Sequence, residues 1–314
     1  MLLRKLPFLP GVGKRLRADR AAGERDPEVL RGLACGAHLA YANGDAWNTV
    51  VDPSPSPKWE RTRLKATWGV TSREGWRETQ ELLLDGEIST FGWDLALDVR
   101  EELAAPSGAH DPYGAYGAYG GAVSGAAWAE GIARTLRERL GPGAADGPAE
   151  ALAKEAARVP RYEERFRADG LLAAGARVRR TLAWDLGRAA NMACWGVNAG
   201  FAHADEARAA LRSAGELARK AYGSWAEFST AYVLGRCLHF DEDTLGSWYR
   251  EVRDSHRLLT RHPESPWTAR ELHDGPYGGP TDPNGGPNGG PYGEGPYGGG
   301  PYGSSGGGAS GHGR

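Results

Sequence analysis

The chain of 314 residues is poor in cysteine, and the three cysteines that it has form no recognisable pattern. Cys35, Cys194 and Cys237 are odd in number and far apart, and no Cys-x-x-Cys pair occurs. Zinc sites need ligands at short fixed spacings, and small secreted domains carry an even, dense set of cysteines. The cysteines therefore predict a reduced, cytoplasmic protein.

The chain also lacks an excess of charge of one sign and a long hydrophobic run. Its 38 Lys and Arg residues face 40 Asp and Glu residues, whereas a nucleic-acid-binding protein usually presents a strongly basic face to phosphates. No apolar run approaches the roughly 18–20 residues that span a bilayer. Residues 1–10 have their charges too late, and an apolar run too short, for a secretory signal. We expect neither a nucleic acid nor a membrane as partner.

Motifs of known catalytic sites are missing as well. The eight histidines form no His-Glu-x-x-His pair, no Gly-x-Ser-x-Gly occurs, and no glycine tract continues into the Lys-Ser/Thr of a phosphate-binding loop. The densest set of metal-binding side chains is His239, Asp241, Glu242 and Asp243. It lies at a predicted helix boundary, where acidic residues commonly cap the next helix. We therefore predict no metal and no cofactor.

Glycine, by contrast, is abundant, and its distribution divides the chain. Of the 40 residues from Gly275 to Arg314, 18 are glycine and 7 are proline, and the tripeptide Pro-Tyr-Gly recurs there and at Pro112. Such segments bury too little apolar surface to offset their ordering entropy. The repeats are either a spacer, which we favour, or multivalent stickers. The predicted organisation is a flexible basic arm over 1–26, a domain over 27–262 with a disordered insertion over about 104–127, and a disordered tail over 263–314.

Hydrophobic periodicity predicts an all-α fold for the domain. Apolar and small residues recur at three- and four-residue spacing through 27–47, 128–140 and 177–201, and nowhere does strict alternation persist over a β-branched run. Two sequences typical of capping boxes, Thr71–Glu74 and Ser224–Glu227, mark the starts of further helices. We predict one multi-helix domain.

Tryptophan is the second abundant feature, with eleven residues. Asp185 and Arg188 are three residues apart and can pair across one helical turn, and Arg236 ends another helix from which it could share Asp185. With Trp184 and Trp225 they form the candidate surface for a ligand or partner, because arginine offers a planar fork of donors. The competing interpretation is a buried ion-pair network among tryptophans of the core.

Three blocks in this order resemble one bacterial family. They are Trp68–Ser72 (Trp-Gly-Val-Thr-Ser), Ala183–Arg188 (Ala-Trp-Asp-Leu-Gly-Arg) and Tyr222–Arg236, which contains Ser-Trp-Ala-Glu and ends in Gly-Arg. Over about residues 59–240 the chain is similar to domain of unknown function 1266. It departs at Asp85–Glu87, where that family often has Gly-His. The resemblance implies a fold and no activity.

The favoured hypothesis for function is a cytoplasmic protein-interaction module without catalysis, of which a toxin-neutralising or conflict-system protein is one instance. The alternative is an enzyme, or a protein that binds a small anion, acting through the Asp–Arg–Trp cluster of Asp185, Arg188 and Arg236. The two hypotheses place this cluster differently. An enzyme needs it around a deep pocket that is open to solvent, whereas an interaction module can keep it in the core. The oligomeric state is left open.

Overall fold

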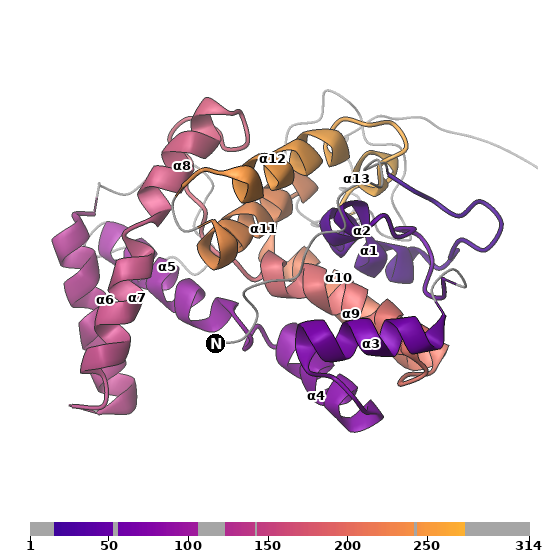
Figure 1. Ribbon diagram of the computed structural model, residues 1–314. Coiled ribbons are helices and arrows are strands. Elements are labelled where there is room, and N and C mark those ends of the chain that lie inside the picture. The colour runs from indigo at the N-terminus through magenta and orange to yellow at the C-terminus, as the bar shows by residue number, and fades with distance from the viewer. Residues whose placement is uncertain (1–15, 53–55, 106–122, 142, 242–243, 274–314) are drawn as a thin grey trace, which may run out of the picture. The chain divides into compact units, whose positions relative to one another are not determined.

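The computed structural model describes residues 16–52, 56–105, 123–141, 143–241 and 244–273, which form helices and their connections (Figure 1). The helices are α1 (Pro27–Cys35), α2 (Ala37–Asn43), α3 (Pro57–Trp68), α4 (Arg73–Leu84), α5 (Thr90–Ala104), α6 (Gly125–Leu140), α7 (Asp146–Ala156), α8 (Val159–Ala168), α9 (Ala183–Ala199), α10 (Ala204–Ala221), α11 (Trp225–Phe240), α12 (Ser247–Leu259) and α13 (Pro266–Ala269). Within these ranges the β-pairing is an isolated bridge between Arg17 and Ala46. The predicted all-α fold is confirmed.

Helix α9 lies at the centre of the described domain. It packs against α1, α2, α3, α4, α10 and α11, and nearly all of its residues are buried (Figure 1). A helix that is apolar or small on every side has to be surrounded by other helices. Its alanines and glycines also let these neighbours approach closely. As a result, α9 contributes side chains both to the Asp185–Arg188 pair and to the pocket described below.

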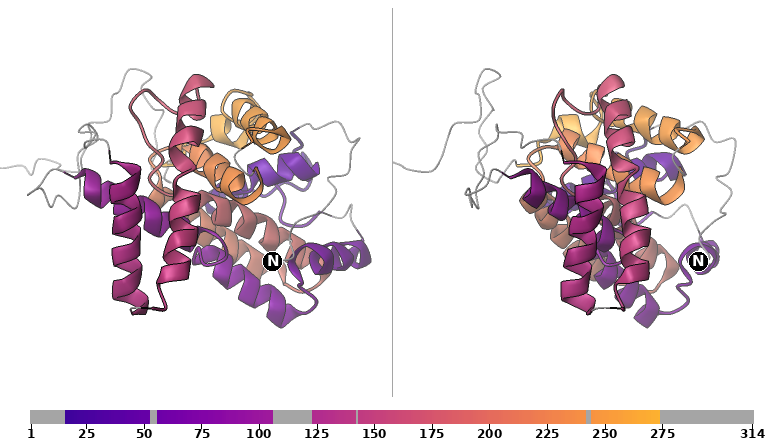
Figure 2. Two further views of the ribbon diagram at one scale, coloured as in Figure 1. Left: turned by 60° about the vertical axis from the view of Figure 1, so that its left-hand side comes forward. Right: turned by 90° about the vertical axis from the view of Figure 1, so that its left-hand side faces the viewer.

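A second group of helices, α5, α6 and α7, pack on one another (Figure 2). Trp128 of α6 is buried, and its indole N–H donates to the carbonyl of Ala96 in α5 at 2.6 Å. Among the described helices, none has the length and apolar character that crossing a lipid bilayer requires.

The predicted capping boxes are right only in part. Ser224 is the N-cap of α11, but the Glu227 carboxylate binds the N–H of the residue before Ser224 and not that of Ser224 itself. Ser224 Oγ accepts the backbone N–H of Glu227 at 3.2 Å, and the Glu227 carboxylate accepts the N–H of Gly223 at 2.7 Å. The capping box at Thr71 is wrong by one residue. Ser72 is the N-cap of α4, and its hydroxyl accepts the N–H three residues further on at 3.2 Å.

The fold extends past both ends of the predicted domain, 27–262. Ahead of it, the carbonyl of Arg17 accepts the N–H of Trp47 at 3.0 Å. Beyond it, Trp267 of α13 is 4% exposed and donates its indole N–H to the carbonyl of Ala34 at 3.0 Å. Most of the segments predicted to be disordered lie outside the described residues, namely 1–15, 106–122 and 274–314.

Candidate functional site

Two helices of the core carry the same spacing of aromatic, glycine and arginine residues: Trp184, Gly187 and Arg188 in α9, and Tyr232, Gly235 and Arg236 in α11. The ring of Tyr232 lies against Gly187, and the side chain of Trp184 lies against Gly235. The two rings meet edge-on, with their centroids 5.0 Å apart. The family-like blocks thus meet face to face, and their aromatic and glycine positions are explained by close helix packing.

Asp185 and Arg188 form the ion pair that their spacing predicts, and both side chains are buried. The Asp185 carboxylate also accepts the backbone N–H of Ser89 at 3.3 Å. The guanidinium carbon of Arg188 lies 4.6 Å from the ring centroid of Trp184 and 5.5 Å from that of Trp68. Burial lowers the pKa of Arg188, but the paired carboxylate favours its charged form.

Arg236 is buried as well, and it forms an ion pair with Glu251 of α12, with Nη2 and Oε2 3.1 Å apart. Its guanidinium carbon lies 5.3 Å from the ring centroid of Trp248. The structure thus pairs the two arginines of the candidate site with two different carboxylates. Both arginines also lie near Tyr232 and His239, and the charges of the two arginines act to lower the pKa of Tyr232 and that of His239.

Trp225 lies at the opposite end of α11 from Arg236. It is 4% exposed, its ring stacks on Trp267 with centroids 5.7 Å apart, and its N–H donates to the carbonyl of Arg270 at 2.9 Å. The structure therefore brings four of the five predicted site residues together and separates Trp225 from them. All five are interior side chains.

The acidic cluster after His239 closes a turn. Asp241 is 1% exposed, and its carboxylate accepts the N–H of Gly246 at 2.9 Å, directly before α12. Burial lowers the pKa of His239 to about 4. The other two members, Glu242 and Asp243, lie outside the described residues. Over the ranges that the structure describes, no group of three or more His, Cys, Asp or Glu side chains is placed to hold a metal ion.

The three cysteines are free thiols, and none is activated. Burial raises the pKa of Cys194 to about 12 and raises that of Cys237 well above its usual range. The charge of Arg236 acts to lower the pKa of Cys237, but burial outweighs it.

A buried chain of hydrogen bonds that the sequence did not reveal joins α2, α11 and α12. Ser229 Oγ lies 2.8 Å from His38 Nε2 and 2.7 Å from His256 Nδ1, and His38 Nδ1 lies 2.7 Å from Ser255 Oγ. Ser255 Oγ donates to the carbonyl of Val252 at 2.9 Å. One set of donors then satisfies every link: His256 Nδ1–H to Ser229, Ser229 to His38 Nε2, and His38 Nδ1–H to Ser255. The chain holds three helices in register, and all four of its polar side chains are interior.

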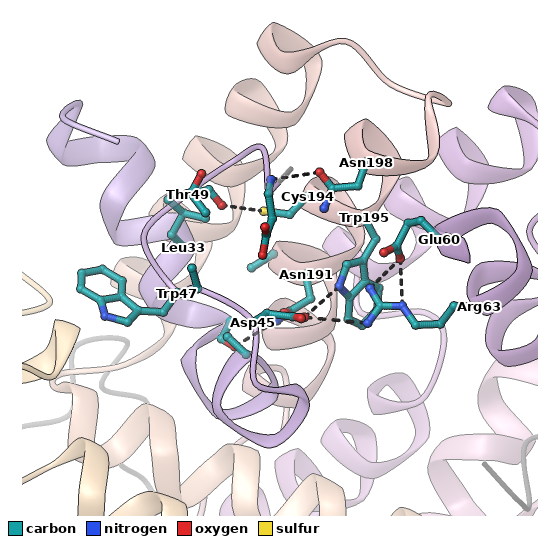
Figure 3. Close-up of a pocket in the computed structure, with 15 residues that line it drawn as sticks. Leu33, Asp45, Trp47, Thr49, Glu60, Arg63, Asn191, Cys194, Trp195 and Asn198 are labelled. Carbon is teal, nitrogen blue, oxygen red and sulfur yellow. Dashed lines mark hydrogen bonds and ion pairs between the residues drawn. The ribbon is translucent and has the colours of Figure 1, made fainter. Parts of the chain in front are cut away.

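A pocket lies on another side of α9, between α1, α2, α3 and the loop that follows α2 (Figure 3). Its lining includes the charged and polar residues Asp45, Thr49, Asp52, Glu60, Arg63, Asn191, Cys194 and Asn198, together with Trp47 and Trp195. The cavity has a volume of about 30 Å³, on a scale on which about 10–15 Å³ holds one water molecule. None of the five predicted site residues lines it.

Hydrogen bonds fix most of the polar groups that line the pocket. Asn198 Oδ1 accepts the N–H of Asp52 at 3.1 Å, and the Cys194 thiol donates to the carbonyl of Thr49 at 3.7 Å. These bonds attach the loop after α2 to α9. The loop thereby forms one wall of the pocket (Figure 3).

Glu60 differs from the rest of the pocket lining because only half of its carboxylate is engaged. The side chain is fully buried, and its Oε1 accepts from Arg63 Nε at 2.9 Å and from Nη2 at 2.5 Å. Its Oε2 is buried and has no hydrogen-bond partner among the described residues. Burial raises the pKa of Glu60, opposed by the charge of Arg63.

The arginine beside Glu60 is held between two indole rings. The Arg63 guanidinium carbon lies 4.3 Å from the ring centroid of Trp195 and 5.1 Å from that of Trp59. Trp195 also donates its N–H to Asp45 at 3.3 Å, and Asp45 lies 3.8 Å from Arg63 (Figure 3). The sequence offered only the Glu60–Arg63 spacing as a signal, since the other walls come from distant segments.

A family model described as "Protein of unknown function (DUF1266)" matches residues 63–272. The match includes the three sequence blocks and extends past the predicted boundary at 240 to the end of the described domain. The chain matches no curated protein and no solved structure. Because the family model covers most of the chain, the resemblance drawn from the three blocks is confirmed, and the protein belongs to the DUF1266 family.

Proposed function

We propose that the protein is a cytoplasmic, non-catalytic interaction module that binds a partner protein at the pocket between α3, α9 and the loop after α2. The single observation that carries this proposal is Glu60. It is fully buried and lines the pocket, and its Oε2 lacks a hydrogen-bond partner. The partner group that we propose is an arginine or lysine side chain on an otherwise apolar segment.

The chemistry of Glu60 favours a cationic donor. A buried acceptor left without a partner costs about 1–3 kcal/mol, and more when it is charged. An entering N–H donor recovers this penalty, and a charged donor forms a stronger bond than a neutral one. Arg63 already uses the other carboxylate oxygen. A second cation at Oε2 is further favoured by Asp45, whose side chain is 33% exposed at the same pocket.

Trp59 supplies apolar contact next to the pocket. It is 48% exposed, and its ring centroid lies 5.1 Å from the guanidinium carbon of Arg63, which lines the pocket. Tryptophan is enriched among the residues that dominate binding at protein interfaces. The ring of Trp59 is already held against Arg63, so that less freedom remains to be lost when a partner binds.

The alternative, an enzyme or an anion-binding protein that uses Asp185, Arg188 and Arg236, has less support. These side chains are at most 4% exposed, and each is engaged in an ion pair and in contacts with neighbouring groups. The difference from Glu60, which is equally buried, is that none of these three residues lines the pocket.

Selection from a library of displayed peptides, seven residues long and fully randomised, tests the proposal. The bait is the full chain. We expect the selected peptides to carry arginine or lysine beside leucine, phenylalanine or another apolar residue. The Trp59→Ala variant should bind a selected peptide at least tenfold more weakly than wild type. The Asp45→Asn variant should also bind it more weakly, and its loss of affinity should be larger in low salt than in high salt.

The matched control is Leu140→Ala, which removes another exposed apolar side chain, 52% exposed at the end of α6. It should leave peptide affinity unchanged. Selection of acidic peptides, or equal binding by wild type and Trp59→Ala, would refute the proposal.

A further inference from the structure

We propose that the pocket between α3, α9 and the loop after α2 binds a dehydrated monovalent cation of about the size of a water molecule, potassium or ammonium. This site goes beyond the proposed function, because it needs no partner protein. It departs from the expectation, drawn from missing ligand spacings in the sequence, that the protein binds no metal. Three observations support it, namely two unused oxygens on buried side chains, the charge of the lining and the size of the cavity.

Two buried side chains from different helices bring to the pocket oxygens that receive no hydrogen bond from the described residues. Glu60 of α3 is fully buried, and its Oε2 has no partner there. Asn191 of α9 is 6% exposed, and its Nδ2 donates to the carbonyls of Gly36 and Gly187 at 3.0 and 2.9 Å. Because these bonds use both amide protons, only Oδ1 of Asn191 is left for the pocket that it lines. Carboxylate and amide oxygens are ligands that hard cations take.

The lining of the pocket carries an excess of negative charge. Its acidic residues are Asp45, Asp52 and Glu60, and its basic residue is Arg63. Arg63 is shared, since its Nη1 lies 3.8 Å from Asp45 and its Nη2 donates to Glu60 at 2.5 Å (Figure 3). Burial raises the pKa of Glu60, and the charges of Asp45 and Asp52 add to this effect. A bound cation would therefore offset the repulsion among the carboxylates that Arg63 leaves.

The size of the cavity and the number of charged ligands favour a monovalent ion over a divalent one. A volume of about 30 Å³ holds about two particles the size of a water molecule, and hence one bare ion with one water. A divalent ion such as calcium takes six to eight oxygens, several of them from carboxylates, and the described part of the chain places no group of three or more acidic, histidine or cysteine side chains to hold one. A potassium ion can exchange its hydration shell for neutral oxygens.

Thermal unfolding of the full chain tests the site. Potassium chloride, ammonium chloride and tetramethylammonium chloride are compared at about 0.1 M, so that exposed charges are screened equally. Tetramethylammonium is the control, because it is too large for the cavity. With a dissociation constant of about 10 mM, potassium or ammonium should raise the Tm by about 3–6 °C over tetramethylammonium. The larger of the two shifts identifies the preferred ion, and equal Tm values in all three salts would overturn the inference.

Variants locate the bound ion. Glu60→Gln keeps the size of the side chain and removes its charge, and it should abolish the shift. The matched control is Glu163→Gln, because Glu163 is 3% exposed, pairs with Arg100 at 3.0 Å and does not line the pocket. It should lower the Tm in every salt and keep the shift. If Glu60→Gln does not fold, Asp45→Asn, at a side chain that is 33% exposed, should reduce the shift. A shift as large as that of wild type in either pocket variant would indicate a general salt effect and overturn the site.

Peptide affinity relates the site to the proposed function. If both hold, potassium competes with a selected basic peptide for Glu60, and the peptide should bind about tenfold more weakly in potassium chloride than in tetramethylammonium chloride. Equal affinity in the two salts, together with a thermal shift, would place the peptide outside the pocket and overturn the proposed function alone. Peptide binding without any thermal shift would overturn the cation site alone.

Discussion

The side chain of Trp184 lies so close to Gly235 that a Cβ atom at residue 235 would stand 2.5 Å from Trp184 Cβ. The opposite contact has the same form, with a Cβ at Gly187 placed 2.6 Å from the Tyr232 ring. In each of the two helices, α9 and α11, a glycine therefore lies against the aromatic residue of the other helix. The spacing shared by the two family-like blocks is the spacing of this reciprocal contact.

We expect Gly235→Ala to destabilise the protein by about 1–3 kcal/mol, the usual range for an overpacked core. The added methyl group would meet the rigid start of a tryptophan side chain, which can move only if α9 and α11 separate. Urea unfolding followed by circular dichroism gives the free energy of unfolding. The control is Gly147→Ala in α7, where a Cβ meets no atom within 4 Å. It should be neutral or stabilising by up to about 1 kcal/mol, and a similar loss at both sites would contradict the reciprocal contact.

The parts of this fold that the sequence predicted correctly depend on local chemistry. The spacing of apolar residues in 177–201 is periodic along the helix itself, so that α9 was recognisable. The same holds for the capping sequence at Ser224 and for the pair Asp185–Arg188, which lie within one turn. Thr71 and Ser72 are chemically alike, and sequence alone did not distinguish which of them caps α4.

The parts that sequence did not predict join distant segments. Glu60 meets a wall of the pocket built by Cys194 and Trp195, and His38 meets Ser229 across 191 positions. The closeness of these groups depends on how α9 and α11 pack, which no local pattern encodes. The structure places four of the five predicted site residues together and Trp225 apart from them, and the tryptophans Trp184 and Trp225 pack in the core.

Breaking the buried ion pair between Asp185 and Arg188 should destabilise the protein strongly, because the remaining partner would be left charged and buried. Arg188→Met and Asp185→Asn should each lower the free energy of unfolding by about 3–5 kcal/mol. The double variant should lose less than the two single losses added together, and the difference measures the coupling. As control, Arg219→Met removes a half-exposed pair with Glu216 and should change stability by at most about 1 kcal/mol. Single variants that are as stable as this control would indicate a free binding site instead of a core pair.

The thiols should be unreactive in the folded protein. The thiolate is the nucleophile, and burial raises the pKa of Cys35, Cys194 and Cys237. At pH 8, a colorimetric disulfide reagent should label the folded protein slowly and the urea-unfolded protein at three sites within minutes. Cys194 should react first, because it lines the pocket. Fast labelling of Cys237 in the folded state would show that Arg236 activates it after all.

Acid should destabilise the protein through the histidine–serine chain. Burial lowers the pKa of His256 to about 4, with Arg261 and Arg257 adding to the effect, and lowers that of His38 well below 6.5, with His256 and Arg236 contributing. Between about pH 6.5 and pH 4 the unfolded chain therefore binds more protons than the folded one. The contribution of the two histidines to the free energy of unfolding is complete above pH 6.5. On acidification the free energy of unfolding falls by up to about 1.4 kcal/mol per pH unit for each histidine.

The test is the slope of unfolding free energy against pH, measured by urea titrations between pH 7.5 and pH 5. His38→Phe keeps a ring against Tyr232, whose centroid lies 4.4 Å from that of His38, and removes one titrating group. Its slope should be lower by up to one proton whatever its absolute stability, because the slope counts protons and not contacts. Leu140→Ala changes no titrating group and should keep the wild-type slope. Equal slopes for wild type and His38→Phe would mean that His38 binds as many protons in the folded state as in the unfolded state, so that folding does not hold it neutral.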